Sequence, residues 1–346
     1  MAGRSSSKKA TESRNARANY VLGLLGGVAV SPPQASKEAM QYYARAAAEG
    51  NPDAQYQLAK LLVEGQTLST NNRAALKWLK KAVEKDHAAS QHLLGRMYLK
   101  GQGVTRDEHR ALELLRQAAI SGNADAEYDL GCALLEGIAG ETDAYQALRW
   151  FRLAGAQGHV QSQYRVGYAL AHGAGCQIDL QQAATWLRKA AVNGDPKGQY
   201  EFGLLFIHPD YTKRNEEEAF RWIRLSALAG FAPAQYQLAL FYQAGEGTLA
   251  SYEEAFIWAR RAAAQGEAKA LILLANLYRF GAGTAVNIPA AYAIASYLSA
   301  ADNPTATALL QTLEPQITSA HRSEVQKLLS GVKSAVELIA AISAHQ

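Results

Sequence analysis

The segment Ala54-Gln55-Tyr56-Gln57-Leu58 decides the fold, because the same five residues return as Ala234-Gln235-Tyr236-Gln237-Leu238. The two copies lie 180 residues apart, which is five times 36. Steps of 36 residues along the chain reach nine anchor positions, all of them small residues, with no insertion or deletion between them. The chain is therefore predicted to be a tandem array of a 36-residue unit. The anchors are Ala18, Ala54, Ser90, Ala126, Ser162, Gly198, Ala234, Ala270 and Ala306.

Other positions of the unit keep the same register when each anchor is counted as position 1. Position 3 is usually tyrosine, position 22 is alanine in all eight full units, and positions 12 and 33 are usually glycine. We expect the aromatic residues at position 25 to fill the core between helix pairs, so that Trp→Ala there costs about 3–5 kcal/mol. All five tryptophans of the chain occupy this position: Trp78, Trp150, Trp186, Trp222 and Trp258.

The pattern within one unit predicts two helices. Apolar residues at positions 1, 5, 8 and 9 are typical of a short helix over positions 1–11, and the glycine at position 12 ends it in a left-handed conformation. Position 18 is usually Asp, Asn or Ser, which suits the N-cap of a second helix that runs to about position 31. Stacked helix–turn–helix units predict an all-α solenoid. The expected caps are Asp107, Asp143, Asp179, Asn215, Ser251 and Asn287.

The consensus of these units resembles the Sel1-like repeat, a relative of the tetratricopeptide repeat, over roughly residues 18–302. The resemblance implies a right-handed α/α superhelix that serves as an adaptor for other proteins, without catalysis and without a cofactor. A cysteine-rich branch of the family binds β-lactams and has paired cysteines, whereas this chain has only Cys132 and Cys176 at unrelated positions. The best matching units preserve Leu94, Gly95, Tyr98, Gly101 and Gly103; Tyr164, Gly167, Gly173, Gly175 and Trp186; and Tyr236, Leu238, Tyr242, Gly245, Gly247 and Trp258.

Three parts of the chain are expected. Residues 1–17 form a disordered basic tail, and residues 18–302 form eight repeats that start near 18, 54, 90, 126, 162, 198, 234 and 270. Residues 303–346 form a degenerate ninth repeat with capping helices over 319–330 and 332–344. An apolar stripe on the last helix is expected to cover the end of the array, and its alternative role is a homodimer contact. The stripe comprises Val332, Val336, Ile339 and Ile342 with Ala335 and Ala340.

The apolar segment 21–30 follows a basic segment and so resembles a secretory signal. The repeat register offers the competing interpretation, because Ala18, Tyr20 and Leu22 match positions 1, 3 and 5 of the unit. We favour a structural first repeat and a cytoplasmic protein. The alternative is a cleaved signal and a secreted or periplasmic protein associated with the cell envelope. Ten residues are too few to span a bilayer, so stable membrane insertion is not expected.

The charge is unevenly distributed. Residues 1–17 contain five basic residues and one acidic residue, which accounts for the whole net charge of +4. The remaining chain is neutral, and a neutral body argues against binding of nucleic acid. The sequence also lacks the His-Glu-x-x-His, phosphate-loop, Gly-x-Ser-x-Gly and dinucleotide motifs. We therefore predict neither an enzyme nor a cofactor or metal site.

The free face of the first helices is the predicted site of function. Positions 4, 7 and 11 vary from unit to unit, and first helices line the groove of such a superhelix. An extended peptide or a helix of another protein suits a surface of this kind, and the alternative is an ordinary solvated face. The loop 208–214 departs from the consensus and is expected to expose an aromatic residue and two cations. The predicted groove residues are Gln57, Lys60, Arg96, Lys100, Asp129, Glu136, Arg165, Tyr168, His172, Glu201, His208 and Gln237.

Overall fold

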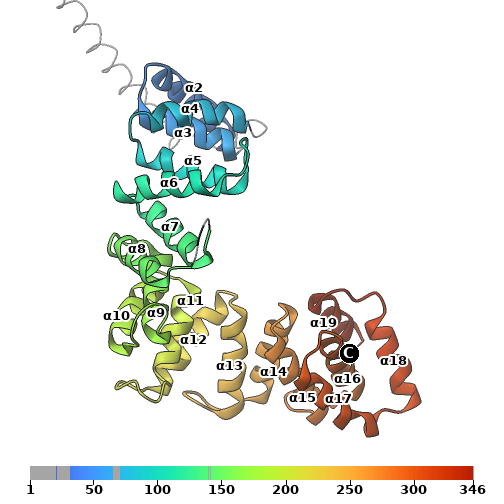
Figure 1. The fold of residues 1–346 in the computed structure, drawn as a ribbon. Coiled ribbons are helices and arrows are strands. Elements are labelled where there is room, and N and C mark those ends of the chain that lie inside the picture. The colour runs from blue at the N-terminus through green and yellow to red at the C-terminus, as the bar shows by residue number, and fades with distance from the viewer. Residues whose placement is uncertain (1–20, 22–31, 65–70, 139, 141, 346) are drawn as a thin grey trace, which may run out of the picture. The chain divides into compact units, whose positions relative to one another are not determined.

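The computed structural model describes residue 21 and residues 32–64, 71–138, 140 and 142–345, and these are helical with no strand (Figure 1). The predicted all-α solenoid of 36-residue units is confirmed. The predicted tail 1–17 and most of the signal-like segment 21–30 lie outside the described residues. The second helices of the units are α2 (Pro32–Ala48), α4 (Asn72–Val83), α6 (Glu108–Ile120), α8 (Ala144–Ala156), α10 (Leu180–Val192), α12 (Glu216–Leu228), α14 (Tyr252–Ala264) and α16 (Ile288–Ser299).

The first helices alternate with these along the chain. Most of them pack on the second helix of their own unit and on that of the preceding unit, as α5 does on α6 and α4. They are α3 (Pro52–Glu64), α5 (Ala88–Lys100), α7 (Ala124–Glu136), α9 (Val160–His172), α11 (Pro196–Leu205), α13 (Ala232–Ala244), α15 (Ala268–Phe280) and α17 (Pro304–Leu313).

The helix ends follow the capping residues. The predicted caps at position 18 are confirmed, since Asp107 Oδ1 accepts from the Arg110 backbone N–H at 2.9 Å and its counterparts do the same. The first helices begin two residues before their anchors, which the sequence reading missed. Asn123 at position 34 caps α7 by accepting from the Ala126 N–H at 2.8 Å. Position 34 therefore carries a second capping signal in most units, with Phe231 before α13 as an exception.

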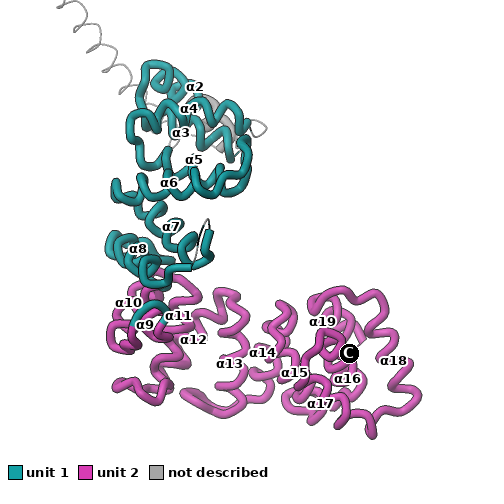
Figure 2. The backbone as a smooth tube through the Cα atoms, viewed as in Figure 1, with its two compact units in different colours: residues 1–165, 174–176 teal, residues 166–173, 177–346 magenta. Residues whose placement is uncertain are grey.

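The chain forms two compact units (Figure 2): unit 1 comprises residues 1–165 and 174–176, and unit 2 comprises residues 166–173 and 177–346. In both, position 26 of the repeat is the fully buried core position of the second helix, as Leu79 and Leu187 show. The prediction that position 25 fills the core holds in full only for Trp258, while Trp78 and Trp150 pack against core clusters without being buried. Only Trp258 is buried, at 6% exposure, whereas the others are half-buried at the edge of the core. Lysines cover two of these rings, with Lys81 4.9 Å from the centroid of Trp78.

Buried glutamines at position 2 join neighbouring repeats, a role that the sequence reading also missed. Each donates through Nε2 to a backbone carbonyl at position 30 of the preceding unit, near the end of its second helix. The distances are 3.1–3.2 Å. Because each bond crosses a repeat boundary, this residue helps to fix the spacing of the stack. The four pairs are Gln55 with Ala47, Gln163 with Gly155, Gln199 with Ala191 and Gln235 with Ala227.

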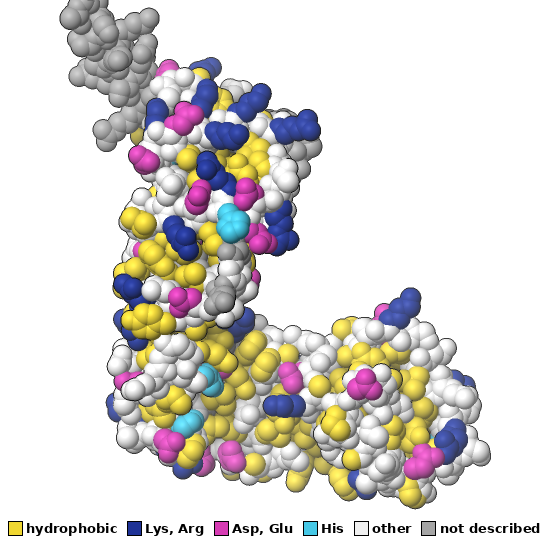
Figure 3. Space-filling model, viewed as in Figure 1, with side chains coloured by type: hydrophobic (Ala, Val, Ile, Leu, Met, Phe, Trp, Pro, Cys, Tyr) yellow, Lys and Arg dark blue, Asp and Glu magenta, His cyan; other side chains and the backbone are white. Residues whose placement is uncertain are grey.

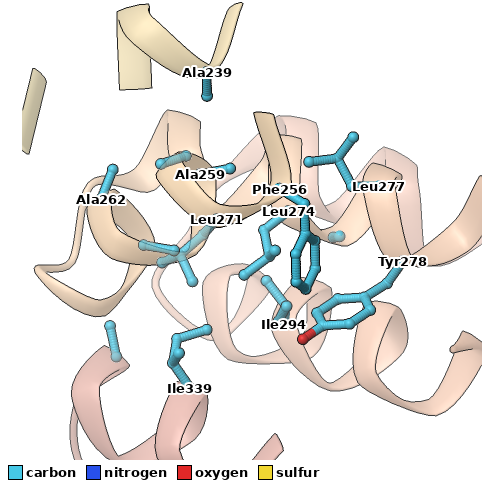
Figure 4. Packing of buried hydrophobic residues seen from close by; sticks show 14 of the residues in the cluster. Ala239, Phe256, Ala259, Ala262, Leu271, Leu274, Leu277, Tyr278, Ile294 and Ile339 are labelled. Carbon is cyan, nitrogen blue, oxygen red and sulfur yellow. The ribbon is translucent and has the colours of Figure 1, made fainter. Parts of the chain in front are cut away.

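The C-terminal helices pack back on unit 2. α17 ends at Leu313, two residues before Pro315, and the short η1 (Glu314–Gln316), α18 (Ser319–Leu329) and α19 (Ala335–Ala344) follow. α18 contacts α16 and α19 contacts α14, and Figure 4 shows Ile339 of α19 directed at the cluster of Leu271 and Phe256. The predicted stripe is wrong at Val336, which is 59% exposed, and at Ala340, which is also exposed, while Leu338 is fully buried instead. Val332 precedes α19, which begins at Ala335 and not at residue 332 as predicted. The homodimer stays a prediction, but Ala335, Ile339 and Ile342 of the stripe on which it depends are buried within the chain.

Candidate functional site

The predicted groove residues all lie on the accessible side of the first helices or just after them. None of the twelve is buried. Lys60, Arg96, Lys100, Glu136, Tyr168 and His172 are exposed, and Gln57, Asp129, Arg165, Glu201, His208 and Gln237 are half-buried. Their accessibility agrees with the surface expected from positions 4, 7 and 11, while their role in binding stays a prediction.

A pocket of about 190 Å³ between α5 and α7 brings four of these residues together in unit 1. Positions 7 and 11 of α5 and positions 4 and 11 of α7 supply its charged rim, because successive first helices present equivalent positions side by side. Its walls are mainly apolar. The volume is below that of a typical small-molecule site, so the pocket suits a single side chain of a partner. The lining residues are Arg96, Leu99, Lys100, Asp129, Cys132, Ala133, Glu136 and Ile138.

The charges around this pocket are only partly compensated. Asp129 lies 2.7 Å from Nε2 of the buried His92 and 3.6 Å from Nε of Arg96. Lys100 and Glu136 are exposed, and neither has an ion-pair partner within 4.0 Å among the described residues. The rim therefore offers one free cation from α5 and one free carboxylate from α7 to a bound partner.

Cys132 lies in the wall of the same pocket but does not have the character of a nucleophile. Burial raises the pKa of its thiol, although the Tyr128 hydroxyl and the Arg165 guanidinium act in the opposite direction. Burial likewise raises the pKa of Tyr128. A thiol with a raised pKa stays protonated near neutral pH, and the thiolate is the reactive form. Cys132 therefore acts here as a small apolar wall residue.

In unit 2 the predicted residues form a smaller cluster on α9 and α11. His172 Nε2 lies 3.2 Å from Glu201 Oε2, and the ring of Tyr168 lies 4.2 Å from the His172 ring. Burial raises the pKa of Glu201, while the neighbouring His172 lowers it. Because Glu201 is already paired with His172, its carboxylate has little capacity to accept further hydrogen bonds. This cluster therefore offers mainly the exposed faces of Tyr168 and His172 to a partner.

The loop 208–214 only partly matches its prediction. Tyr211 is buried, at 5% exposure, and packs edge-on against Phe206, so the aromatic residue expected at the surface anchors the loop instead. Lys213 and Arg214 are exposed as expected. His208 contributes to an open pocket of about 460 Å³ with Ala171, Ile178, Asp179, Leu180, Gln181, Asp210 and Thr212.

Comparison with known families explains the spacing of these sites. The Sel1 repeat matches eight consecutive segments: 16–51, 52–87, 88–123, 124–159, 160–195, 196–231, 232–267 and 268–302. The chain belongs to the Sel1 repeat family. Proteins built from Sel1 repeats are generally non-catalytic scaffolds for other proteins.

A solved Sel1 repeat structure agrees with the fold. A Sel1 repeat protein from Oxalobacter formigenes is 26% identical, with a TM-score of 0.61 over 66% of this chain and 90% of that chain. A protective antigen with this fold from uropathogenic Escherichia coli is 24% identical, with a TM-score of 0.47 over 96% of this chain and 87% of that chain. The comparison with curated proteins found no match.

Two sites in this Sel1 repeat array have a serine, a histidine and an aspartate in the contact order of a catalytic triad. His159 Nδ1 lies 2.9 Å from Ser162 Oγ, and its Nε2 lies 3.5 Å from Asp125. The site at His87, Ser90 and Asp53, 72 residues earlier, has the same arrangement. Both serines are fully buried, and each histidine Nδ1 also accepts from the serine backbone N–H. A substrate could not reach such a hydroxyl, so these groups serve as helix caps that also join adjacent repeats.

The described part of the Sel1 repeat array contains no group of three or more His, Cys, Asp or Glu residues placed to hold a metal ion. His172 and Cys176, which are four residues apart in sequence, belong to no such group. Of the helices that the structure describes, none has the length and apolar character needed to cross a membrane.

Proposed function

We propose that this protein is a non-catalytic scaffold that binds a segment of another protein along the first-helix face of unit 1. This face comprises Gln57, Lys60, Arg96, Lys100, Asp129 and Glu136 on α3, α5 and α7. The pocket between α5 and α7 is the observation that carries the proposal, because it combines apolar walls with the unpaired charges of Lys100 and Glu136. Buried anchor side chains surrounded by polar contacts are typical of protein interfaces.

The partner is best described by what this pocket accepts. One apolar side chain would enter it, and an acidic and a basic group on the same segment would face Lys100 and Glu136. An extended peptide and a partner helix both present side chains at suitable spacing. We place this interaction in the cytoplasm, because residues 16–51 match a repeat in full. The alternative is a secreted or periplasmic envelope protein, which requires cleavage near residue 30.

Capture from a cell lysate followed by quantitative mass spectrometry tests the proposal. The bait is the full chain, compared with the charge swap Lys100→Glu with Glu136→Lys, which conserves net charge and disturbs no described ion pair. Arg188→Glu with Glu217→Lys on the second helices is the matched control, since both residues are exposed. We expect a partner that the control retains and the swap loses by about tenfold. Equal capture of every protein by all three baits would contradict the proposal.

A further inference from the structure

The exposed face of α4 carries four cations and no acidic residue. Arg73, Lys77, Lys80 and Lys81 are all exposed, and their spacing of four, three and one residues places them on one side of the helix. The opposite side is buried in the core through Leu76 and Leu79 with two alanines. We call these four cations the α4 basic face. It extends about 12 Å along the helix axis.

Ion pairs within the protein do not account for this concentration of charge, although Lys81 lies over the Trp78 ring. Among the described residues, none of the four cations has a carboxylate within 4.0 Å. Arg73 and Lys77, and likewise Lys77 and Lys81, are like charges four residues apart, an arrangement that destabilises a helix. Lys80 and Lys81 lie in the last turn, where the helix dipole favours cations, but Arg73 lies in the first turn, where it does not. The face therefore has a stability cost that a bound anion would offset.

Among the second helices that the structure describes, no other carries four cations without an acidic residue, although α8 and α10 each have two cations and no acidic residue. Within their bounds, α6 and α14 have two cations and two acidic residues each, and α12 has two cations and three acidic residues. The net charge of residues 18–346 is zero, but α4 nevertheless forms a local basic surface. In Figure 3, Lys and Arg side chains gather over the part of unit 1 that Figure 1 labels α2 to α4.

The chemistry of this face favours a diffuse anionic surface over a shaped ligand. Three of its four cations are lysines, which act as point charges, whereas arginine is the residue that recognises single carboxylates and phosphates by paired hydrogen bonds. None of the four cations lines one of the pockets described above. The aromatic ring of the same helix, Trp78, is half-buried with Lys81 over it and so offers no anchor. A peptide partner would find no pocket on this face into which a side chain could insert.

The geometry points to a peripheral membrane contact: the α4 basic face binds the anionic headgroups of a lipid bilayer. A planar array of monovalent anions matches exposed lysines on one rigid helix face, and each adjacent Lys or Arg strengthens such binding about fivefold. This contact would hold the scaffold at a membrane surface and leave the first-helix face of unit 1 for its protein partner. It requires no membrane-spanning helix.

Vesicle co-sedimentation of the full chain tests this inference. The probes are vesicles of phosphatidylcholine alone and vesicles in which about a quarter of the lipid is phosphatidylglycerol. The variant is Lys77→Gln with Lys80→Gln and Lys81→Gln. The matched control is Arg152→Gln with Arg188→Gln and Arg224→Gln, three exposed cations on α8, α10 and α12. All proteins keep residues 1–17, and their thermal unfolding midpoints serve as the folding check.

We expect binding to the anionic vesicles only, weakened about a hundredfold in the α4 variant and far less in the control. Raising the NaCl concentration from about 0.05 to about 0.5 M should abolish the binding. Three outcomes would overturn the inference: binding that is equal on neutral vesicles, equal losses in the variant and the control, or no vesicle binding at all. Binding of a short DNA duplex in place of vesicles, lost with the same variant, would also overturn it and assign the face to nucleic acid.

Discussion

At the scale of single residues, the side-chain oxygen of the buried glutamine at repeat position 2 accepts a hydrogen bond in some units and has no donor in others. Gln235 Oε1 accepts from Gln265 Nε2 at 2.8 Å, and Gln265 also donates to the Gly230 carbonyl of the preceding unit at 3.0 Å. In the preceding unit Gln199 Oε1 is buried with no hydrogen-bond partner, because Ala229 occupies the place of Gln265. An unpaired buried acceptor costs about 1–3 kcal/mol.

The substitution Ala229→Gln should therefore stabilise the protein by about 1 kcal/mol, because the new amide would donate to Gln199 Oε1. Ala229 is exposed at the end of α12, so the longer side chain meets no obstruction. The urea midpoint measures the effect. Ala301→Gln is the control at the same repeat position, and it should change little because Leu271 replaces the glutamine there. Equal effects of both substitutions would refute the pairing.

Glu127 is the acidic member of the position-2 series, and it should make stability depend on pH. Burial raises its pKa above the ordinary value of 4.5, although the hydrogen bond from Gln157 opposes this. The folded chain thus binds the proton more tightly than the unfolded chain, so Glu127 reduces stability as the pH rises from about 4.5 through the raised pKa. Glu127→Gln should stabilise the protein by about 1 kcal/mol at pH 7.

The advantage of Glu127→Gln should shrink as the pH approaches 4, where the carboxyl group of the wild type is protonated. Thermal unfolding midpoints of both proteins across about pH 4 to 8 measure this dependence. A difference between the two proteins that stayed constant with pH would show that the carboxyl group does not titrate as we describe.

At the scale of elements, the second glycine of each Gly-x-Gly loop lets neighbouring units approach. Gly247 has a φ of +64°, and a β-carbon there would lie 2.2 Å from the carbonyl oxygen of Glu216 in the preceding unit. Gly247→Ala should therefore destabilise the protein by about 2–3 kcal/mol, more than the backbone conformation alone costs. Gly230→Ala is the control, because its φ of +90° is also positive but no atom lies within 4 Å of an added β-carbon. Equal urea midpoints for the two variants would argue against the close approach.

The sequence predicts elements well where a residue type has one physical role. Asp107 at position 18 can act as a cap from its place before an apolar run, and it does. Trp78 and Leu79 are both apolar, and periodicity does not decide which of the two adjacent positions faces the core. The same ambiguity explains Val336 and Leu338 in α19. Which of two adjacent apolar residues is buried depends on the neighbouring helix that each side chain contacts. The local sequence pattern does not contain that information.

At the scale of the whole molecule, the 36-residue register is enough to predict the fold, because each unit contacts mainly its neighbours. It also places the accessible residues of the first helices correctly. The pocket between α5 and α7 was not predicted, since Leu99, Ala133 and Ile138 show their role only once two helices are placed side by side. The α4 basic face was not predicted because the net charge of the whole chain does not show where the individual charges cluster.

We propose above all that unit 1 binds a partner protein through its first-helix face. The most direct test is the dissociation constant of the purified complex, measured by titration calorimetry with the partner captured by the wild type. We predict that Lys100→Glu with Glu136→Lys weakens binding about tenfold, while Arg188→Glu with Glu217→Lys leaves it unchanged. Equal dissociation constants for all three proteins would contradict the claim.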